Sequence, residues 1–88
     1  MSFAYDWKKN TINMTKHGID FVEAQRLWDD SKRKEVEAKP SLSDEERFLV
    51  VGKIDDKFWT AIVTYREDVI RIISVRRSRS DEVERYES

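Results

Sequence analysis

The chain has 88 residues, of which 39% are hydrophobic and 40% charged, with 17 basic side chains against 18 acidic ones and no cysteine. A chain of this length supports one hydrophobic core, so we expect a single domain over residues 1–88. The lack of cysteine excludes disulfides and cysteine-based zinc sites, and no apolar run reaches the roughly 20 residues of a membrane helix. We therefore expect a cytoplasmic protein with no cofactor and no membrane contact.

The first residues predict a short strand and a helix. Aromatic residues alternate with other residues over 3–7, which is the pattern of a half-buried strand. A helix should follow over residues 7–16, with Asp6 as its N-terminal cap. Gly18 stands where a left-handed residue would end this helix.

A second helix is predicted to start at Asp20. Asp20 and Glu23 have the spacing of a capping box, and the following apolar residues share one helical face. These residues are Phe21, Ala24, Leu27 and Trp28. The helix should end near residues 29–30.

After this point the apolar period changes to two, which predicts four strands. They cover residues 33–40, 47–54, 58–66 and 69–77. Short turns between consecutive strands imply antiparallel neighbours. A final helix would be capped by Ser78 and Asp81, or by Ser80 alone. The order is β-α-α-β-β-β-β-α, and we expect an α+β domain with two N-terminal helices packed on one face of a twisted antiparallel sheet.

A two-residue turn at Glu67 and Asp68 would set the register of the last two strands. Arg66 would then oppose Val69, and Arg71 would oppose Thr64. One face would hold Trp59, Ala61, Val63, Tyr65, Ile70, Ile72, Ser74 and Arg76, and we expect it to be the core. The other would hold Thr60, Ile62, Thr64, Arg66, Val69, Arg71, Ile73, Val75 and Arg77.

Basic residues are the candidates for chemistry. Five arginines lie between residues 66 and 79 against two acids, and Lys16 and His17 end the first predicted helix. Arginine matches phosphate oxygens and histidine transfers protons, so the set suits cleavage of a phosphodiester without a metal. The alternatives are a solvated strand surface for the arginines, a helix cap for His17 and a packing role for Tyr86.

Four stretches taken together resemble the BrnT family of bacterial toxins. They are "FAYDW" at 3–7, "KHGIDFVEA" at 16–24, "ERFLVVGKID" at 46–55 and "RIISVRRSRSDEVERYE" at 71–87. The resemblance covers nearly the whole chain in order, although Val75 stands where the family often has alanine. It implies a RelE-like fold and a ribonuclease toxin of a type II toxin–antitoxin pair.

The resemblance also implies partners and site residues. A BrnA-like antitoxin would neutralise the toxin, and operator DNA would be contacted only through that antitoxin. The interpretation that follows is a metal-independent endoribonuclease that cleaves RNA to arrest translation and growth. Lys16, His17, Arg71 and Arg76 would be catalytic, and Arg66, Arg77 and Tyr86 would bind RNA. The alternative is a non-catalytic binding module that acts with its antitoxin as an operon co-repressor.

Overall fold

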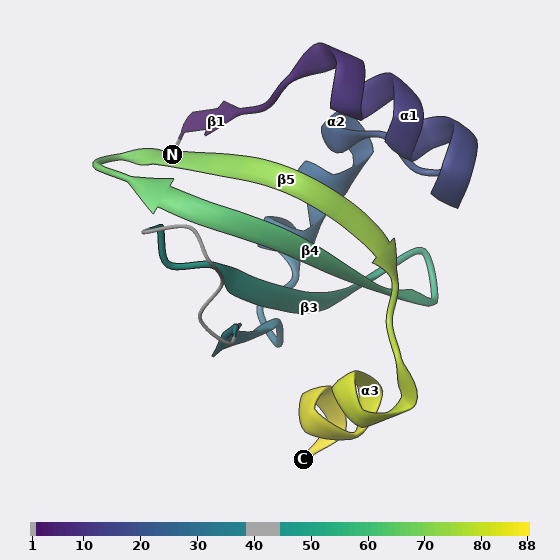
Figure 1. Cartoon of the computed structure of the whole chain (residues 1–88). Coiled ribbons are helices and arrows are strands. Elements are labelled where there is room, and N and C mark those ends of the chain that lie inside the picture. Colours follow the sequence, from purple (N-terminus) through teal and green to yellow (C-terminus); the bar gives the residue numbers. More distant parts are fainter. Residues whose placement is uncertain (1, 39–44) are drawn as a thin grey trace.

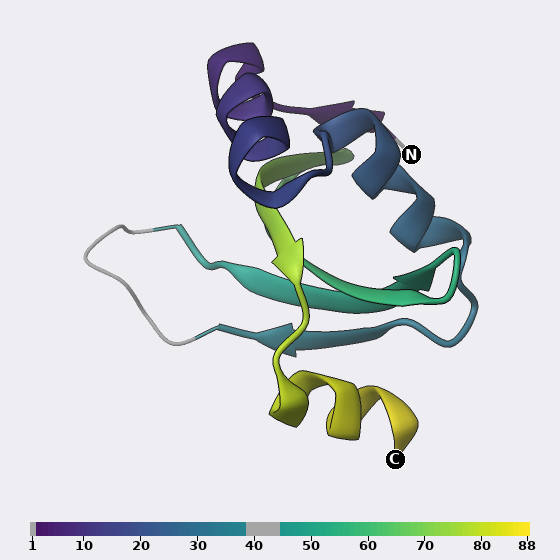
Figure 2. The ribbon, with the colours of Figure 1, turned by 90° about the vertical axis from the view of Figure 1, so that its right-hand side faces the viewer.

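The computed structural model describes residues 2–38 and 45–88. They form an α+β structure around a five-stranded sheet with the strand order β1-β5-β4-β3-β2. The elements are β1 (Ser2–Ala4), α1 (Trp7–His17), α2 (Phe21–Ala24), the 3₁₀ helix η1 (Gln25–Asp29), β2 (Lys34–Glu37), β3 (Phe48–Ile54), β4 (Lys57–Arg66), β5 (Val69–Arg77) and α3 (Ser80–Glu87). The helices α1, α2 and η1 lie on one side of the sheet and α3 on the other (Figure 1, Figure 2).

The helix boundaries follow the expected capping residues. The Asp6 carboxylate accepts a hydrogen bond from the Lys8 N–H at 2.8 Å, and the Asp20 carboxylate accepts one from the Glu23 N–H at 2.8 Å. Gly18 ends α1 in the left-handed conformation, with φ 75°. The second helix is divided, because only Phe21–Ala24 is α-helical and the next five residues are 3₁₀.

The sheet is mixed, which corrects the expectation of a purely antiparallel one. The pairs β2–β3, β3–β4 and β4–β5 are antiparallel, and the turn at 67–68 gives the expected pairing of Arg66 with Val69 and of Thr64 with Arg71. The short strand β1, however, pairs in parallel with the start of β5. No local pattern predicts this pairing, because the two strands are separated by most of the sequence. Residues 39–40 of the predicted strand 33–40 lie outside the described residues.

A β-bulge in β5 corrects the predicted faces of its second half. Ile62 pairs with Ser74 and Val63 with Ile72, so Ile73 is an extra residue in β5. Ile72 and Val75 therefore both enter the core although they are three residues apart. After the bulge the alternation is reversed. The residues predicted in the core, Ser74 and Arg76, lie on the far side from α1 and α2, and Val75 and Arg77 lie on the near side.

The hydrophobic core fills the space between the sheet and the N-terminal helices. It is formed by Ile19, Phe21, Ala24, Leu27, Val50, Ile54, Trp59, Ala61, Val63, Ile70, Ile72 and Val75. Gly52 lies in the middle of β3, where a Cβ atom would come within 2.8 Å of Leu27 Cδ2. The close packing of η1 on β3 therefore depends on a glycine at this position.

The start of α3 differs from the predicted serine caps. The N-cap is Arg79, whose N–H donates to the Glu82 carboxylate at 2.8 Å. The Ser78 hydroxyl is hydrogen-bonded to that of Thr60 at 2.8 Å instead. Glu82 therefore replaces the predicted caps as the residue that satisfies the start of the helix.

Candidate functional site

The side of α1 that faces the protein is polar. Asn13 is 5% exposed, and its amide donates to Val75 O at 2.9 Å while its Oδ1 accepts from the Val75 N–H at 3.1 Å. It also donates to Ile19 O at 2.9 Å. Strand β1 ends opposite Arg71, so it leaves the backbone of β5 beyond that point without a neighbouring strand on this edge. The Asn13 amide forms the hydrogen bonds with Val75 that a neighbouring strand would form. This contact fixes α1 along β5.

His17 lies on the same side of α1 as Asn13, because the two residues are four positions apart. Its imidazole is half-buried, and the exposed Lys16 precedes it in the last turn. Within the part of the chain that the structure describes, no hydrogen bond or ion pair engages either side chain. Gly18 then turns the chain away, and its N–H donates to Met14 O at 2.9 Å. The end of α1 therefore presents an imidazole and an ammonium group that have no partner in residues 2–38 and 45–88.

Arg77 brings a guanidinium group to this end of the molecule. It is two residues beyond Val75, and its guanidinium carbon lies 5.4 Å from the centroid of the Trp59 ring. From the Asn13–Val75 contact, four residues of helix advance about 6 Å and two residues of strand about 7 Å. Since α1 and β5 run in the same direction (Figure 1), His17 and Arg77 reach the same end of the sheet.

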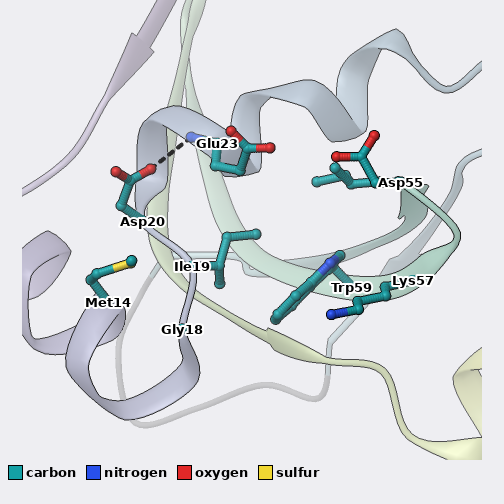
Figure 3. A pocket seen from close by; sticks show the side chains of 9 residues that line it. Met14, Gly18, Ile19, Asp20, Glu23, Asp55, Lys57 and Trp59 are labelled. Carbon is teal, nitrogen blue, oxygen red and sulfur yellow. Dashed lines mark hydrogen bonds between the residues drawn. The ribbon is translucent and has the colours of Figure 1, made fainter.

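A hollow of about 530 Å³ opens beside this end (Figure 3). It lies between the α1–α2 junction and the β3–β4 turn. Its lining residues are Met14, Gly18, Ile19, Asp20, Glu23, Ile54, Asp55, Lys57 and Trp59. Arg26 forms two hydrogen bonds of 2.8 Å with Asp55 and an ion pair with Glu23. Its hydrogen bonds lower the pKa of Asp55 and keep that carboxylate charged.

Arg76 points to the other face and is held by Glu82. Its two terminal nitrogens donate to the two carboxylate oxygens at 2.8 and 2.9 Å, and the Thr60 hydroxyl donates to the same carboxylate at 2.9 Å. Glu82 is buried, and the hydrogen bonds from Arg76 lower its pKa to about 2. Burial opposes this shift but does not cancel it. Arg76 therefore joins β5 to α3.

Arg71 is separated from this end of the sheet. It is half-buried opposite Thr64, and no carboxylate among the described residues pairs with it. The Thr64 hydroxyl also has no hydrogen-bond partner in the described part of the chain, although the residue is only 2% exposed. From Thr64 to Trp59, which opposes Arg77, five strand residues span about 16 Å. Arg71 and Arg77 therefore cannot contact one phosphate group together.

The remaining predicted residues, Arg66 and Tyr86, lie farther away. Arg66 ends β4 and forms an ion pair with Glu45, six residues or about 20 Å along the strand from Thr60. The Tyr86 hydroxyl donates to Asp30 at 2.8 Å, and its ring meets that of Phe58 edge-on at 5.2 Å. Burial and, to a lesser extent, the Asp30 carboxylate raise the pKa of Tyr86. This tyrosine fastens α3 to the rest of the protein.

Asn13 and Trp59 were not predicted as site residues. The signal for Asn13 is the polar stripe Asn10, Asn13 and His17, whose spacing of three and four residues marks one side of a helix. The alternation in β4 predicts only a core position for Trp59, and no sequence signal pairs it with Arg77. In residues 2–38 and 45–88, no three His, Asp or Glu side chains are grouped so that they could hold a metal ion together.

Comparison with known proteins identifies the family. A search of the curated proteins gave no match. A family model described as the ribonuclease toxin BrnT of type II toxin–antitoxin systems matches residues 5–82. This range includes Lys16, His17 and Arg77 of the candidate site. The chain therefore belongs to the BrnT family of ribonuclease toxins.

Proposed function

We propose that this chain is a metal-independent endoribonuclease whose catalytic centre lies where α1 and β5 end. The single observation that carries this assignment is the double hydrogen bond between Asn13 and Val75. It holds the end of α1 against β5. From helix and strand spacing we infer that His17, which has no protein partner among the described residues, comes to the same end of the sheet as Arg77. The chemistry needs a proton-transfer group and cations in one place, and this arrangement supplies both.

The reaction we propose is an attack of the ribose 2′-oxygen on the adjacent phosphorus. A base takes the 2′ proton, the phosphorane gains negative charge, and the bond to the 5′-oxygen breaks as that oxygen receives a proton. His17 transfers protons in this scheme, and Lys16 and Arg77 stabilise the charge on the phosphoryl oxygens. The products are a 2′,3′-cyclic phosphate and a 5′-hydroxyl.

The other predicted arginines take different roles in this proposal. Arg76 is a positioning residue, because its guanidinium is paired with Glu82 at the exit of β5. Arg71 binds a flanking RNA phosphate, which the lack of a carboxylate partner in the described residues supports. Arg66 lies farther along the same strand pair and extends this contact; its ion pair with Glu45 is exposed to solvent, so an RNA phosphate can compete with that carboxylate. Tyr86 is left out of the RNA-binding set because its hydroxyl is used by Asp30.

The proposal includes the cellular setting. A BrnA-like antitoxin neutralises the chain, and operator DNA is contacted only through that antitoxin. Residues 1–88 form one toxin domain with a RelE-like fold, which the packing of α1, α2 and η1 on the sheet supports. No helix in the described part of the chain is long and apolar enough to span a membrane. We place the activity in the cytoplasm, where RNA is available.

The test is cleavage of purified RNA by the isolated chain in the presence of EDTA, with the end groups of the products identified. His17→Gln should lower the rate about 100-fold or more. Lys16→Ala should lower it as well, whereas Lys9→Ala, two helical turns earlier on the same side of α1, is the matched control. All variants should melt cooperatively at the temperature of the wild type.

Two results would contradict the proposal in different ways. Cleavage that requires a divalent metal would remove the proposed mechanism, and full activity of His17→Gln would remove the proposed site. If folded wild-type protein left both purified RNA and translating extracts intact, the non-catalytic co-repressor would become the better interpretation.

A further inference from the structure

Helix α1 has its polar and apolar sides reversed relative to an ordinary surface helix. Its only buried residue is Asn13, while all three of its apolar side chains are exposed: Trp7 by 69%, Ile12 by 63% and Met14 by 51%. A helix on a protein surface normally turns its apolar residues to the core. At about 100° per residue, Trp7 and Met14 lie together along the helix and Ile12 lies about 140° around it, with Lys8 between them. An exposed tryptophan with two further exposed apolar side chains on one helix marks a candidate interaction surface.

The exposed side of α1 is also uniformly basic. The helix carries Lys8, Lys9 and Lys16 and no acidic residue. Helical spacing of about 100° per residue places these lysines on the solvent side with Ile12. A partner that buries the apolar side chains must therefore bring negative charge, since unpaired lysines at the rim of an interface disfavour association. An acidic amphipathic segment meets both requirements.

We propose that the outer face of α1, defined as Trp7, Lys8, Lys9, Ile12 and Met14, docks an acidic amphipathic segment of the antitoxin. This inference rests on the antitoxin partnership proposed above. Met14 also lines the hollow beside the site, and Lys16 and His17 follow directly at the end of the helix. A segment lying along α1 therefore reaches the catalytic centre and covers it. The contact that gives the antitoxin its affinity for the toxin then also blocks the catalytic centre.

The proposal fits the energetics of the free chain. Trp7 is the first residue of α1 and is mostly exposed, so it adds little to the stability of the isolated protein. Tryptophan is enriched among the residues that carry most of the binding energy at protein interfaces. The outer face of α1 therefore offers a large aromatic anchor that the fold itself does not use.

The experiment measures the affinity of the chain for the purified antitoxin encoded beside it, by calorimetry and without RNA. Trp7→Ser should weaken binding at least about tenfold, and Trp7→Ser combined with Ile12→Ser should weaken it further. Lys8→Glu should also weaken binding, most strongly at low salt, because the effect is electrostatic. Lys32→Glu is the matched charge reversal at an exposed position before β2 and should leave the affinity unchanged.

The outcomes separate this proposal from the ribonuclease assignment. Binding by the wild type that Trp7→Ser and the double variant leave unchanged would overturn the docking surface alone, whatever the chain does to RNA. Absence of any binding by wild-type protein would overturn the antitoxin partnership and the docking surface with it. Self-association of the free chain that Trp7→Ser abolishes, with antitoxin affinity unchanged, would assign the face to a second copy of this chain instead.

Discussion

The side chain of Asn13 pairs with the peptide unit of Val75 as a neighbouring strand would, with one hydrogen bond of 2.9 Å and one of 3.1 Å. The amide supplies one donor and one acceptor to a strand edge that β1 has stopped covering. A second hydrogen of the same amide group is used by Ile19 O. One buried side chain thus connects a helix, a strand and the junction between two helices.

Asn13→Asp should lower the free energy of unfolding by about 2 to 4 kcal/mol. A carboxylate keeps the acceptor for the Val75 N–H but sets negative charge against the carbonyls of Val75 and Ile19. Asn10→Asp is the matched control, because Asn10 acts only as an acceptor, from the Phe21 N–H at 2.6 Å. Urea unfolding should show this loss of unfolding free energy for Asn13→Asp, and a change in unfolding free energy below about 1 kcal/mol for Asn10→Asp. Equal losses would contradict this account.

The Glu82 carboxylate should make stability depend on acidic pH. Its pKa is about 2 in the folded protein against 4.5 for an ordinary glutamate. A lowered folded pKa means that the stabilisation is present above the ordinary value and is lost as the pH falls toward 2. The stability gap between wild type and Glu82→Gln should narrow by about 2 kcal/mol between pH 6 and pH 3. The comparison cancels the carboxylates that both proteins share, and a constant gap would refute the assignment.

Arg76 and Glu82 should be energetically coupled. Removing either partner leaves an unpaired charge at a largely buried position. The losses of unfolding free energy in the two single alanine variants should therefore each exceed half of the loss in the double variant. A double-mutant cycle should give a coupling energy of about 2 to 3 kcal/mol. If Arg76 acts on cleavage only through this pair, Glu82→Ala should reduce cleavage about as much as Arg76→Ala. Loss of cleavage with Arg76→Ala alone would show that the guanidinium contacts RNA directly.

Tyr86→Phe should affect stability but not cleavage. The variant removes the hydrogen bond to Asp30 and keeps the ring contact with Phe58, so we expect a loss of about 1 kcal/mol. The cleavage rate of purified RNA should stay within about twofold of the wild type. A large loss of cleavage with an unchanged melting temperature would restore Tyr86 to the RNA-binding site predicted from the sequence.

Local signals predicted much of the secondary structure. Asp6 and Asp20 cap the helices where the sequence places them, and the turn at 67–68 sets the expected register beside it. The local signals give the wrong faces in the second half of β5, where the extra residue Ile73 shifts the alternation of side chains. Neither Ile73 nor its neighbours carries a mark of the bulge, and a shift of one residue moves every later side chain to the other face.

The arrangement of the candidate site was predicted only in part. Lys16, His17 and Arg77 were named as candidates from residue type and family resemblance, and the structure brings them to one end. The pairing of Arg76 with Glu82 depends on the bulge and on the position of α3, which are tertiary features. The contact of Asn13 with Val75 joins residues 62 positions apart, and no pattern in a single sequence indicates such a contact.

The parallel pairing of β1 with β5 has a consequence for the order of folding during synthesis. Strand β1 and helix α1 leave the ribosome well before their partners at residues 69–71 and Val75, which are made more than 50 residues later. Contacts between such distant segments form late, because a long loop must close first. The nascent chain therefore cannot assemble the end of α1 against β5 until residues 69–77 have left the ribosome.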